Sequence, residues 1–99
     1  MRYEDLPRDE KNGAVLPEQV EFPIGFRLLR PLSKDGVQCA EIEMREPTVL
    51  DLETAHREKS DMGRTVALLS HLLELTPDEV RRLGTRDFSR LGEVVAAFL

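Results

Sequence analysis

The side chains best suited to chemistry in this sequence are one cysteine and two histidines. Cys39 lies between Gln38 and Ala40, which bring no cation or histidine to activate its thiol, so we interpret it as a small apolar filler. His56 and His71 lack the close ligand spacing of zinc sites. The sequence therefore predicts no internal disulfide, no redox centre and no metal site.

The remaining polar residues show no pattern of an enzyme, which needs a nucleophile with a base, a placed carboxylate pair or a phosphate-binding loop. The six glycines are scattered, and no glycine-rich loop precedes a helix. Glu41 and Glu43 fall on one side of an expected strand, and we interpret them as a solvated face that resists aggregation. We therefore predict a protein without catalytic activity and without a cofactor.

Four arginines gather near the C-terminus and raise the question of nucleic-acid binding. They are Arg81, Arg82, Arg86 and Arg90. Over residues 76–90 these four bases meet three acidic residues, so the local balance is only +1 in a chain of net charge −5. Phosphate binding depends on local positive potential, so this balance disfavours DNA and RNA as ligands. A small DNA-binding regulator that uses the Arg81–Arg90 helical corner stands as the alternative function.

Length and composition predict one small acidic domain, because the chain has 99 residues, of which 40% are hydrophobic and 33% charged. No apolar run approaches the roughly 20 residues that cross a membrane. The N-terminus opens with charged residues rather than with the apolar stretch of a secretory signal, so we expect the protein to stay in a cytosol.

Residues 1–25 differ from the rest of the chain in charge and in proline content. They hold six acidic and three basic residues, together with Pro7, Pro17 and Pro23, and their few apolar residues follow no period. Such a segment buries too little apolar area to offset its ordering entropy. We predict a flexible acidic tail, disordered or extended, which is either an arm that orders on a partner or a dispensable leader.

Folding signals begin at Phe26 and predict a β-hairpin over residues 26–45. Residues 26–32 alternate imperfectly, residues 40–44 alternate cleanly, and residues 33–36 supply turn chemistry between them. Ala40, Ile42 and Met44 share one side of the second strand and need a covering surface. Because Pro31 donates no backbone hydrogen bond, we expect its strand to lie at an edge or to end there.

The rest of the chain predicts four helices, at about 48–58, 61–75, 77–83 and 86–98. Thr48 and Asp51 fit a variant of the capping box, and Thr76–Glu79 combines a cap, an N1 proline and a returning glutamate. We expect Gly84 to end the third helix and Thr85 to cap the fourth. The predicted fold class is α+β, with an N-terminal hairpin, a small bundle of about four helices and a disordered N-terminal tail.

The apolar residues of these helices predict how each one packs. Val49, Leu52 and His56 share one face of the first helix, so His56 should border an apolar stripe. The second helix is apolar over about half of its circumference and is the expected central helix. His71 falls on its polar side and should be exposed.

Four sequence elements, taken in order, resemble the small tail assembly chaperones of contractile-tailed, Mu-like bacteriophages and prophages. The first element is the motif Arg45, Glu46, Pro47, Thr48 and Asp51. The later elements are Val66–Leu69 in a leucine-rich helix, Thr76–Leu83 and Asp87–Leu91. The resemblance extends from about Phe26 to Leu99, and the first 25 residues fall outside it.

The resemblance implies a non-enzymatic chaperone in the cytoplasm of the bacterial host. Its expected partners are the tape measure protein and the tail tube protein of the same phage or prophage, and further copies of itself. It is expected to keep the apolar stretches of the tape measure protein soluble and to be absent from the mature virion. A tape measure helix exposes apolar stripes that small amphipathic modules could cover.

Two sets of residues are candidates for contacts with a partner. We predict that Phe88, Leu91, Val95 and Phe98, with part of the second helix, divide between the core and a partner surface. The alternative is that all of them are core, and for the second helix we favour that alternative. The Arg45–Asp51 motif is interpreted as structural, with a docking edge as its alternative role.

Overall fold

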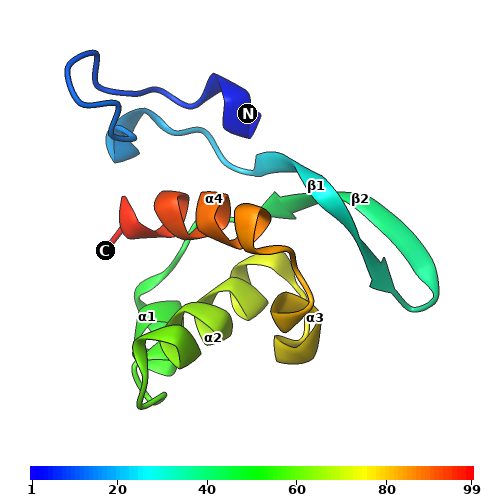
Figure 1. The fold of residues 1–99 in the computed structure, drawn as a ribbon. Helices are drawn as coiled ribbons and strands as arrows, with labels where there is room; N and C mark the ends of the chain where they lie inside the picture. Colours follow the sequence, from blue (N-terminus) through cyan, green and yellow to red (C-terminus); the bar gives the residue numbers. More distant parts are fainter.

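The computed structural model describes all 99 residues and shows an α+β fold, as predicted. An antiparallel hairpin of β1 (Ile24–Lys34) and β2 (Val37–Met44) precedes four helices (Figure 1). The helices are α1 (Val49–Ala55), α2 (Asp61–Leu73), α3 (Pro77–Arg81) and α4 (Thr85–Ala96). None of them is long and apolar enough to cross a membrane.

The hairpin turns at Asp35 and Gly36, whose φ angles of 53° and 78° fit the tight turn expected from the sequence. Its strands pair regularly from Ile24 opposite Met44 as far as Arg27, and again from Leu32 onwards. Between these stretches β1 holds extra residues, so the pairing shifts.

This irregularity changes which side of β2 faces the core. Ile42 and Met44 are buried as predicted, but Ala40 is exposed and Cys39 turns inward to pack against the core. Because the side-chain period of a strand is two, a shift of pairing within the hairpin reverses the face of every residue beyond it. The prediction for Ala40 was therefore wrong, whereas Cys39 has the filler role expected of it.

The core joins the hairpin to the helices, and β1, β2, α2, α3 and α4 all contribute apolar side chains to its centre. Its most completely buried apolar members are Ile24, Phe26, Met44, Leu69, Leu72, Val80, Leu91 and Val94. One backbone hydrogen bond, from the amide of Arg45 to the carbonyl of Leu72 at 3.1 Å, fastens the end of β2 to α2. The central position expected for α2 is confirmed, and His71 is exposed as predicted.

Three of the four predicted helix starts are confirmed, including that of α2 at Asp61, and the fourth is wrong. Capping boxes are present at Thr48 with Asp51 and at Thr76 with Glu79. Thr85, however, is the first residue of α4, and the N-cap is Gly84, which has no side chain to cap with. Gly84 has a φ of −65°, so it does not end α3 with the left-handed conformation that a glycine cap uses. Gly84 instead has an extended backbone conformation and is the N-cap residue of α4.

The buried face of α1 also differs from the predicted one. Val49 is 72% exposed and His56 is exposed, whereas Asp51 and Ala55 are buried and Leu52 is half-buried. The cause is the carboxylate of Asp51, which turns inward to its hydrogen-bond donors and brings Ala55, one turn later, to the inside with it.

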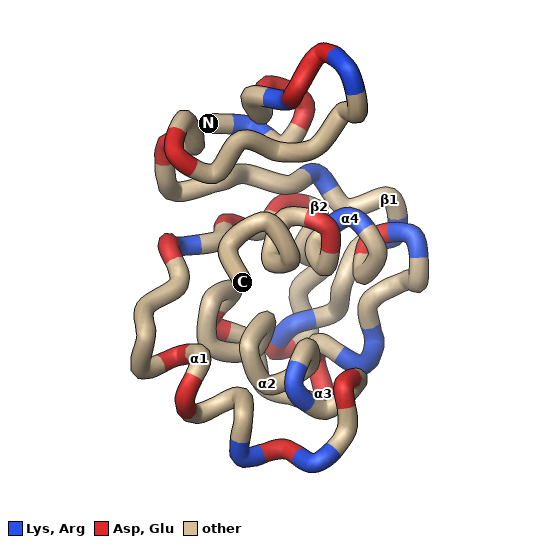
Figure 2. The backbone as a smooth tube through the Cα atoms, turned by 90° about the vertical axis from the view of Figure 1, so that its left-hand side faces the viewer, with Lys and Arg blue, Asp and Glu red and all other residues tan.

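The largest correction concerns residues 1–23, which do not form the disordered tail that we expected. They lie against one side of α4, away from α1–α3 (Figures 1 and 2). Leu6 and Val15 are buried in the core, and the Tyr3 ring stacks at 5.4 Å from Phe26. The prediction failed because it relied on the low average hydrophobicity of this segment. A few isolated apolar side chains are enough to order it where the folded domain already presents an apolar surface.

Candidate partner-binding site

Helix α4 is fastened to the hairpin by Asp87, whose side chain is only 1% exposed. Its two carboxylate oxygens accept hydrogen bonds from the amides of Leu29, at 2.9 Å, and Arg30, at 3.1 Å. These amides lie in the stretch of β1 where pairing with β2 is interrupted. The Asp87 carboxylate thus replaces a strand as the acceptor for β1.

Arg90 completes this connection from the next turn of α4. Its Nη2 donates to Asp87 at 2.6 Å and to the carbonyl of Arg27 at 2.7 Å. Burial would raise the pKa of Asp87, but hydrogen bonds from Leu29, Arg90 and Arg30 outweigh burial and hold the pKa below its ordinary value. Asp87 is therefore a charged residue inside the fold that is satisfied by its donors.

The first side of α4 is covered by the N-terminal segment and carries its polar anchors. The Glu93 carboxylate accepts from the Tyr3 hydroxyl at 2.8 Å and from Arg8 at 3.0 and 3.1 Å. The hydrogen bonds from Arg8 lower the pKa of Glu93 from its ordinary value. Phe98 stacks on Phe22 at 5.3 Å between ring centroids. This side of α4 is therefore closed by the chain itself.

The opposite side of α4 borders two apolar pockets whose other wall is α2. The first has a volume of about 270 Å³ and opens beside the N-terminal half of α4. Phe88 contributes from α4, Met62 and Val66 from α2, and Arg81 from α3. The side chain of Met62 is 63% exposed at its edge.

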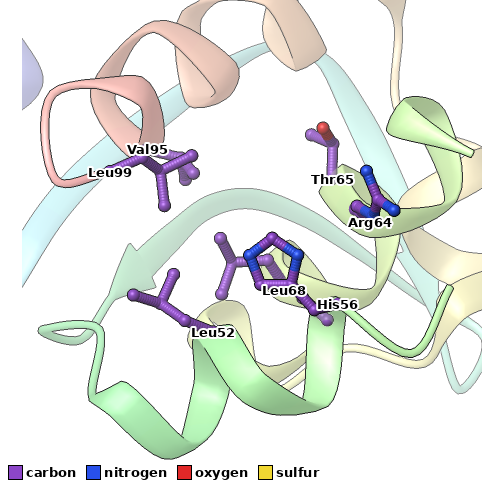
Figure 3. Close-up of a pocket in the computed structure, with 8 residues that line it drawn as sticks. Leu52, His56, Arg64, Thr65, Leu68, Val95 and Leu99 are labelled. Carbon is purple, nitrogen blue, oxygen red and sulfur yellow. The ribbon is translucent and has the colours of Figure 1, made fainter.

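The second pocket lies beside the C-terminal end of α4 and has a volume of about 90 Å³. Figure 3 shows Val95 and Leu99 on one side of it, and side chains of α1 and α2 on the other. Arg64 and His56 lie at its edge, and Leu99 is 75% exposed. The two pockets together leave apolar surface between α2 and α4 that no part of the chain covers, which is typical of a binding surface.

The four candidate contact residues therefore divide along α4. Leu91 and Val95 are buried, whereas Phe88 and Phe98 are half-buried. Phe98 faces the covered side, and Phe88 borders the open pocket. Val95 is a core residue whose surface also forms part of the second pocket. Of the four, Phe88 and Val95 are thus the two that line the open side.

The motif of residues 45–51 forms the corner between β2 and α1. Arg45 donates to both Asp51 oxygens, at 2.7 and 2.9 Å, and the amide and hydroxyl of Thr48 donate to the same carboxylate. The hydrogen bonds from Arg45 are the main reason that the pKa of Asp51 is far below its ordinary value. Glu46 is exposed and Pro47 half-buried at this corner. The contacts of Arg45, Thr48 and Asp51 fit the structural role that we predicted.

The arginine corner does not present all four of its bases to one ligand. Arg90 is engaged with Asp87 and the carbonyl of Arg27, and Arg81 pairs with Asp78 at 3.0 Å. Helix α3, which contributes to this corner, has only five residues. Arg81 and Arg82 border, together with Arg30, a polar pocket of about 420 Å³. The engagement of Arg90 and the local charge balance of only +1 nevertheless disfavour a DNA-binding regulator.

Sequence reasoning missed two features of the site. The long-range role of Asp87 was invisible because the amides that donate to it, those of Arg30 and Leu29, lie 57 and 58 positions away. The second feature, the closure of one side of α4 by residues 1–23, had no signal in the periodicity.

Comparison with known proteins now adds the function class. The family described as phage tail assembly chaperone proteins, E, or 41 or 14 matches residues 25–99, which is most of the chain and includes both pockets. The chain belongs to this family. It is therefore a tail assembly chaperone and not an enzyme. Searches of curated proteins and of solved structures found no match.

The family match begins at the second residue of β1, so the hairpin except Ile24 and all four helices of this chaperone lie within it. Residues 1–24 lie outside the match even though Leu6 and Val15 pack in the same core. The chaperone thus consists of the family domain with an added N-terminal segment on one side of α4. The other side of α4 carries no such addition.

Proposed function

We propose that this tail assembly chaperone binds the tape measure protein of its own phage or prophage and assists assembly of the tail tube around it. The binding takes place in the cytoplasm of the bacterial host, and the chaperone is absent from the finished virion. The family supports this proposal because a tail assembly chaperone must have tail proteins as partners.

The observation that carries the proposal is the uncovered apolar surface between α2 and α4. Met62 and Leu99 are largely exposed at its two ends, and Phe88 and Val95 lie between them along α4. In a chain of this size, exposed apolar side chains next to a pocket are a cost unless another molecule covers them. A helical protein with long apolar stripes, such as a tape measure protein, is a partner that would cover them.

Co-expression tests the proposal directly. The chaperone is produced in bacteria together with the tape measure protein from the same phage genome, and soluble and insoluble fractions are compared with and without it. We expect the chaperone to raise the soluble fraction of the tape measure protein and to co-purify with it. An unchanged soluble fraction and no co-purification would contradict the proposal.

A paired set of variants links the result to the surface. The double variant Met62→Glu, Leu99→Glu places charges on exposed positions at both ends of the surface, so it should fold and lose co-purification. The matched double variant His71→Glu, Ser89→Glu places the same charges on exposed positions that line neither pocket, and it should retain co-purification. Adding the tail tube protein to the co-expression then tests whether the complex includes it.

A further inference from the structure

We propose that the groove between α2 and α4 holds an amphipathic α-helix with acidic edges, whose backbone crosses α4 closely at Gly92. We call this surface the α2–α4 groove and define it by the pocket-lining residues Met62, Thr65, Phe88, Val95 and Leu99. Gly92 lines neither pocket and joins the definition through its position on α4 between Phe88 and Val95. The inference rests on the proposed function and specifies the segment of the tape measure protein that would bind there.

The two pockets belong to one groove because of the spacing of residues on α4. Phe88, Gly92 and Val95 follow one another by four and three positions, which places them on one face of α4, and Leu99 lies beyond the end of that helix. Phe88 lines the first pocket, Val95 and Leu99 line the second, and Gly92 lies between them. Helix α2 borders both pockets through residues 62–68 in its N-terminal part.

Gly92 is the point where the groove is most accessible to another backbone. A Cβ atom built at Gly92 would have no other atom within 4 Å, so nothing inside the chain requires a glycine there. Glycine within a helix is unfavourable relative to alanine, so its presence needs another reason. The other helical glycine, Gly63, has one, because its Cβ would approach the Ser60 hydroxyl to 2.9 Å. At Gly92 the missing side chain would instead allow a second helix to approach.

The charges along the groove define the edges of that second helix. Arg81 borders the first pocket and Arg64 the second, and no acidic residue lines either one. Their carboxylate partners within the chain, Asp78 and Asp61, are highly exposed and three residues away on the same helical turn. Such pairs are weak, so both arginines are available to carboxylates of a bound helix. Arg64 also donates from its Nε to the carbonyl of Glu58 at 3.0 Å, which leaves its terminal nitrogens for a carboxylate. A chain of net charge −5 thus presents bases at this surface.

A second copy of the chain is a poorer occupant than an acidic helix. In a symmetric dimer formed through the groove, the same surface of each copy would face the other. Arg64 and Arg81 would then meet the same arginines rather than carboxylates. Like charges across an interface oppose association, so the charge pattern favours a different chain.

Two synthetic helical peptides test the charge prediction without the tape measure protein. They share one apolar face and differ only at its edges, where one carries glutamates and the other lysines. We expect the full-length chaperone to bind the glutamate peptide about tenfold or more tightly than the lysine peptide in fluorescence anisotropy, with a gap that narrows at high salt. Equal affinity, tighter binding of the lysine peptide, or no binding of either would overturn the inference.

Two matched pairs of variants locate the binding. Gly92→Leu should weaken binding of the glutamate peptide by about tenfold or more, because the leucine side chain fills the point where the peptide crosses α4. His71→Leu adds a leucine outside the groove and should leave the affinity unchanged. Arg64→Glu with Arg81→Glu should remove the preference for glutamate edges, and Arg57→Glu with Lys59→Glu makes the same charge change in a loop outside the groove. Thermal melts confirm that each variant is folded. Equal effects within either pair would overturn the inference.

Sedimentation equilibrium and the co-expression test separate the remaining outcomes. A dimer of the unmodified chaperone that Gly92→Leu abolishes would overturn the inference, because a second copy would then occupy the groove. A further outcome is co-purification of the tape measure protein with both the Gly92→Leu variant and the arginine variant. That result would overturn the inference that the groove binds it and would leave the proposed function intact. Tight binding of the glutamate peptide without any co-purification would contradict the proposed function instead.

Discussion

The two sides of α4 face different surroundings within one small protein. On the covered side, Glu93 is bound by Tyr3 and Arg8, and Phe98 stacks on Phe22 of the N-terminal segment. On the open side, Phe88 and Val95 border pockets, and Gly92 faces empty space. Side chains on the covered side of α4 have both polar and apolar partners within the chain. The exposed side chains on the open side have neither.

This difference follows from which residues of the chain cover each side of α4. The covered side is closed by residues outside the family match, so this chaperone adds its own partner there. The open side lies wholly within the matched domain, where a binding surface of the family would be expected. Asp87 holds α4 against β1 and thereby fixes the position of both sides of the helix. The following predictions test that arrangement.

Replacing Asp87 should have the largest effect, because it disturbs the attachment of α4 itself. In Asp87→Ala, the amides of Leu29 and Arg30 lose their acceptor, and the half-buried Arg90 loses its carboxylate partner and keeps only the carbonyl of Arg27. We expect the free energy of unfolding to fall by about 3–5 kcal/mol, measured by urea denaturation. Asp78→Ala, at an exposed ion pair, is the control and should cost under about 1 kcal/mol. A small loss in Asp87→Ala would mean that α4 is seated by packing alone.

Replacing Glu93 should weaken only the covered side. Glu93→Gln removes the charge that Arg8 and Tyr3 bind at the surface, and we expect a loss of about 1 kcal/mol at neutral pH. Because the pKa of Glu93 is lower in the folded state than in the unfolded one, its contribution is complete above the unfolded pKa of about 4.3 and disappears as the pH falls through the folded value.

The measurement for Glu93 is a comparison of stability curves against pH. The difference between the unmodified protein and Glu93→Gln should be constant from neutral pH down to about pH 5 and should shrink below about pH 4. Binding of the glutamate peptide should be unaffected, since Glu93 lies on the other side of α4. A difference that grows on acidification would show that another group controls this contact.

Replacing Gly92 by alanine should have the smallest effect on stability, and in the opposite direction. Since the added methyl group meets no atom, Gly92→Ala should stabilise the free protein by about 0.5 kcal/mol through helix propensity. Thermal unfolding at matched concentrations measures this change. Gly13→Ala is the contrasting control, because Gly13 has a φ of +72° and alanine there should be destabilising. A destabilising effect at Gly92 would indicate a contact at this position within the chain.

Much of the family domain could be read from local sequence because local interactions decide it. The hairpin turn needs two residues with positive φ, and Asp35 with Gly36 supplies them. The capping boxes at Thr48 and Thr76 involve partners only three residues away, so spacing alone predicts them. The same reasoning placed Phe88 and Val95 on one face of the last helix, although it did not show which side of that face would be covered.

The sequence by itself determined the order of elements, the helix starts at Thr48 and Thr76, and the absence of a catalytic pattern, because these follow from residue types at short spacing. Only the tertiary structure decided that residues 1–23 close one side of α4, that Asp87 serves β1, and that Gly92 faces an open groove. Each of these depends on residues far apart in the chain. These residues come together on surfaces that form only when the hairpin packs against the helices, and a local sequence pattern does not predict such packing.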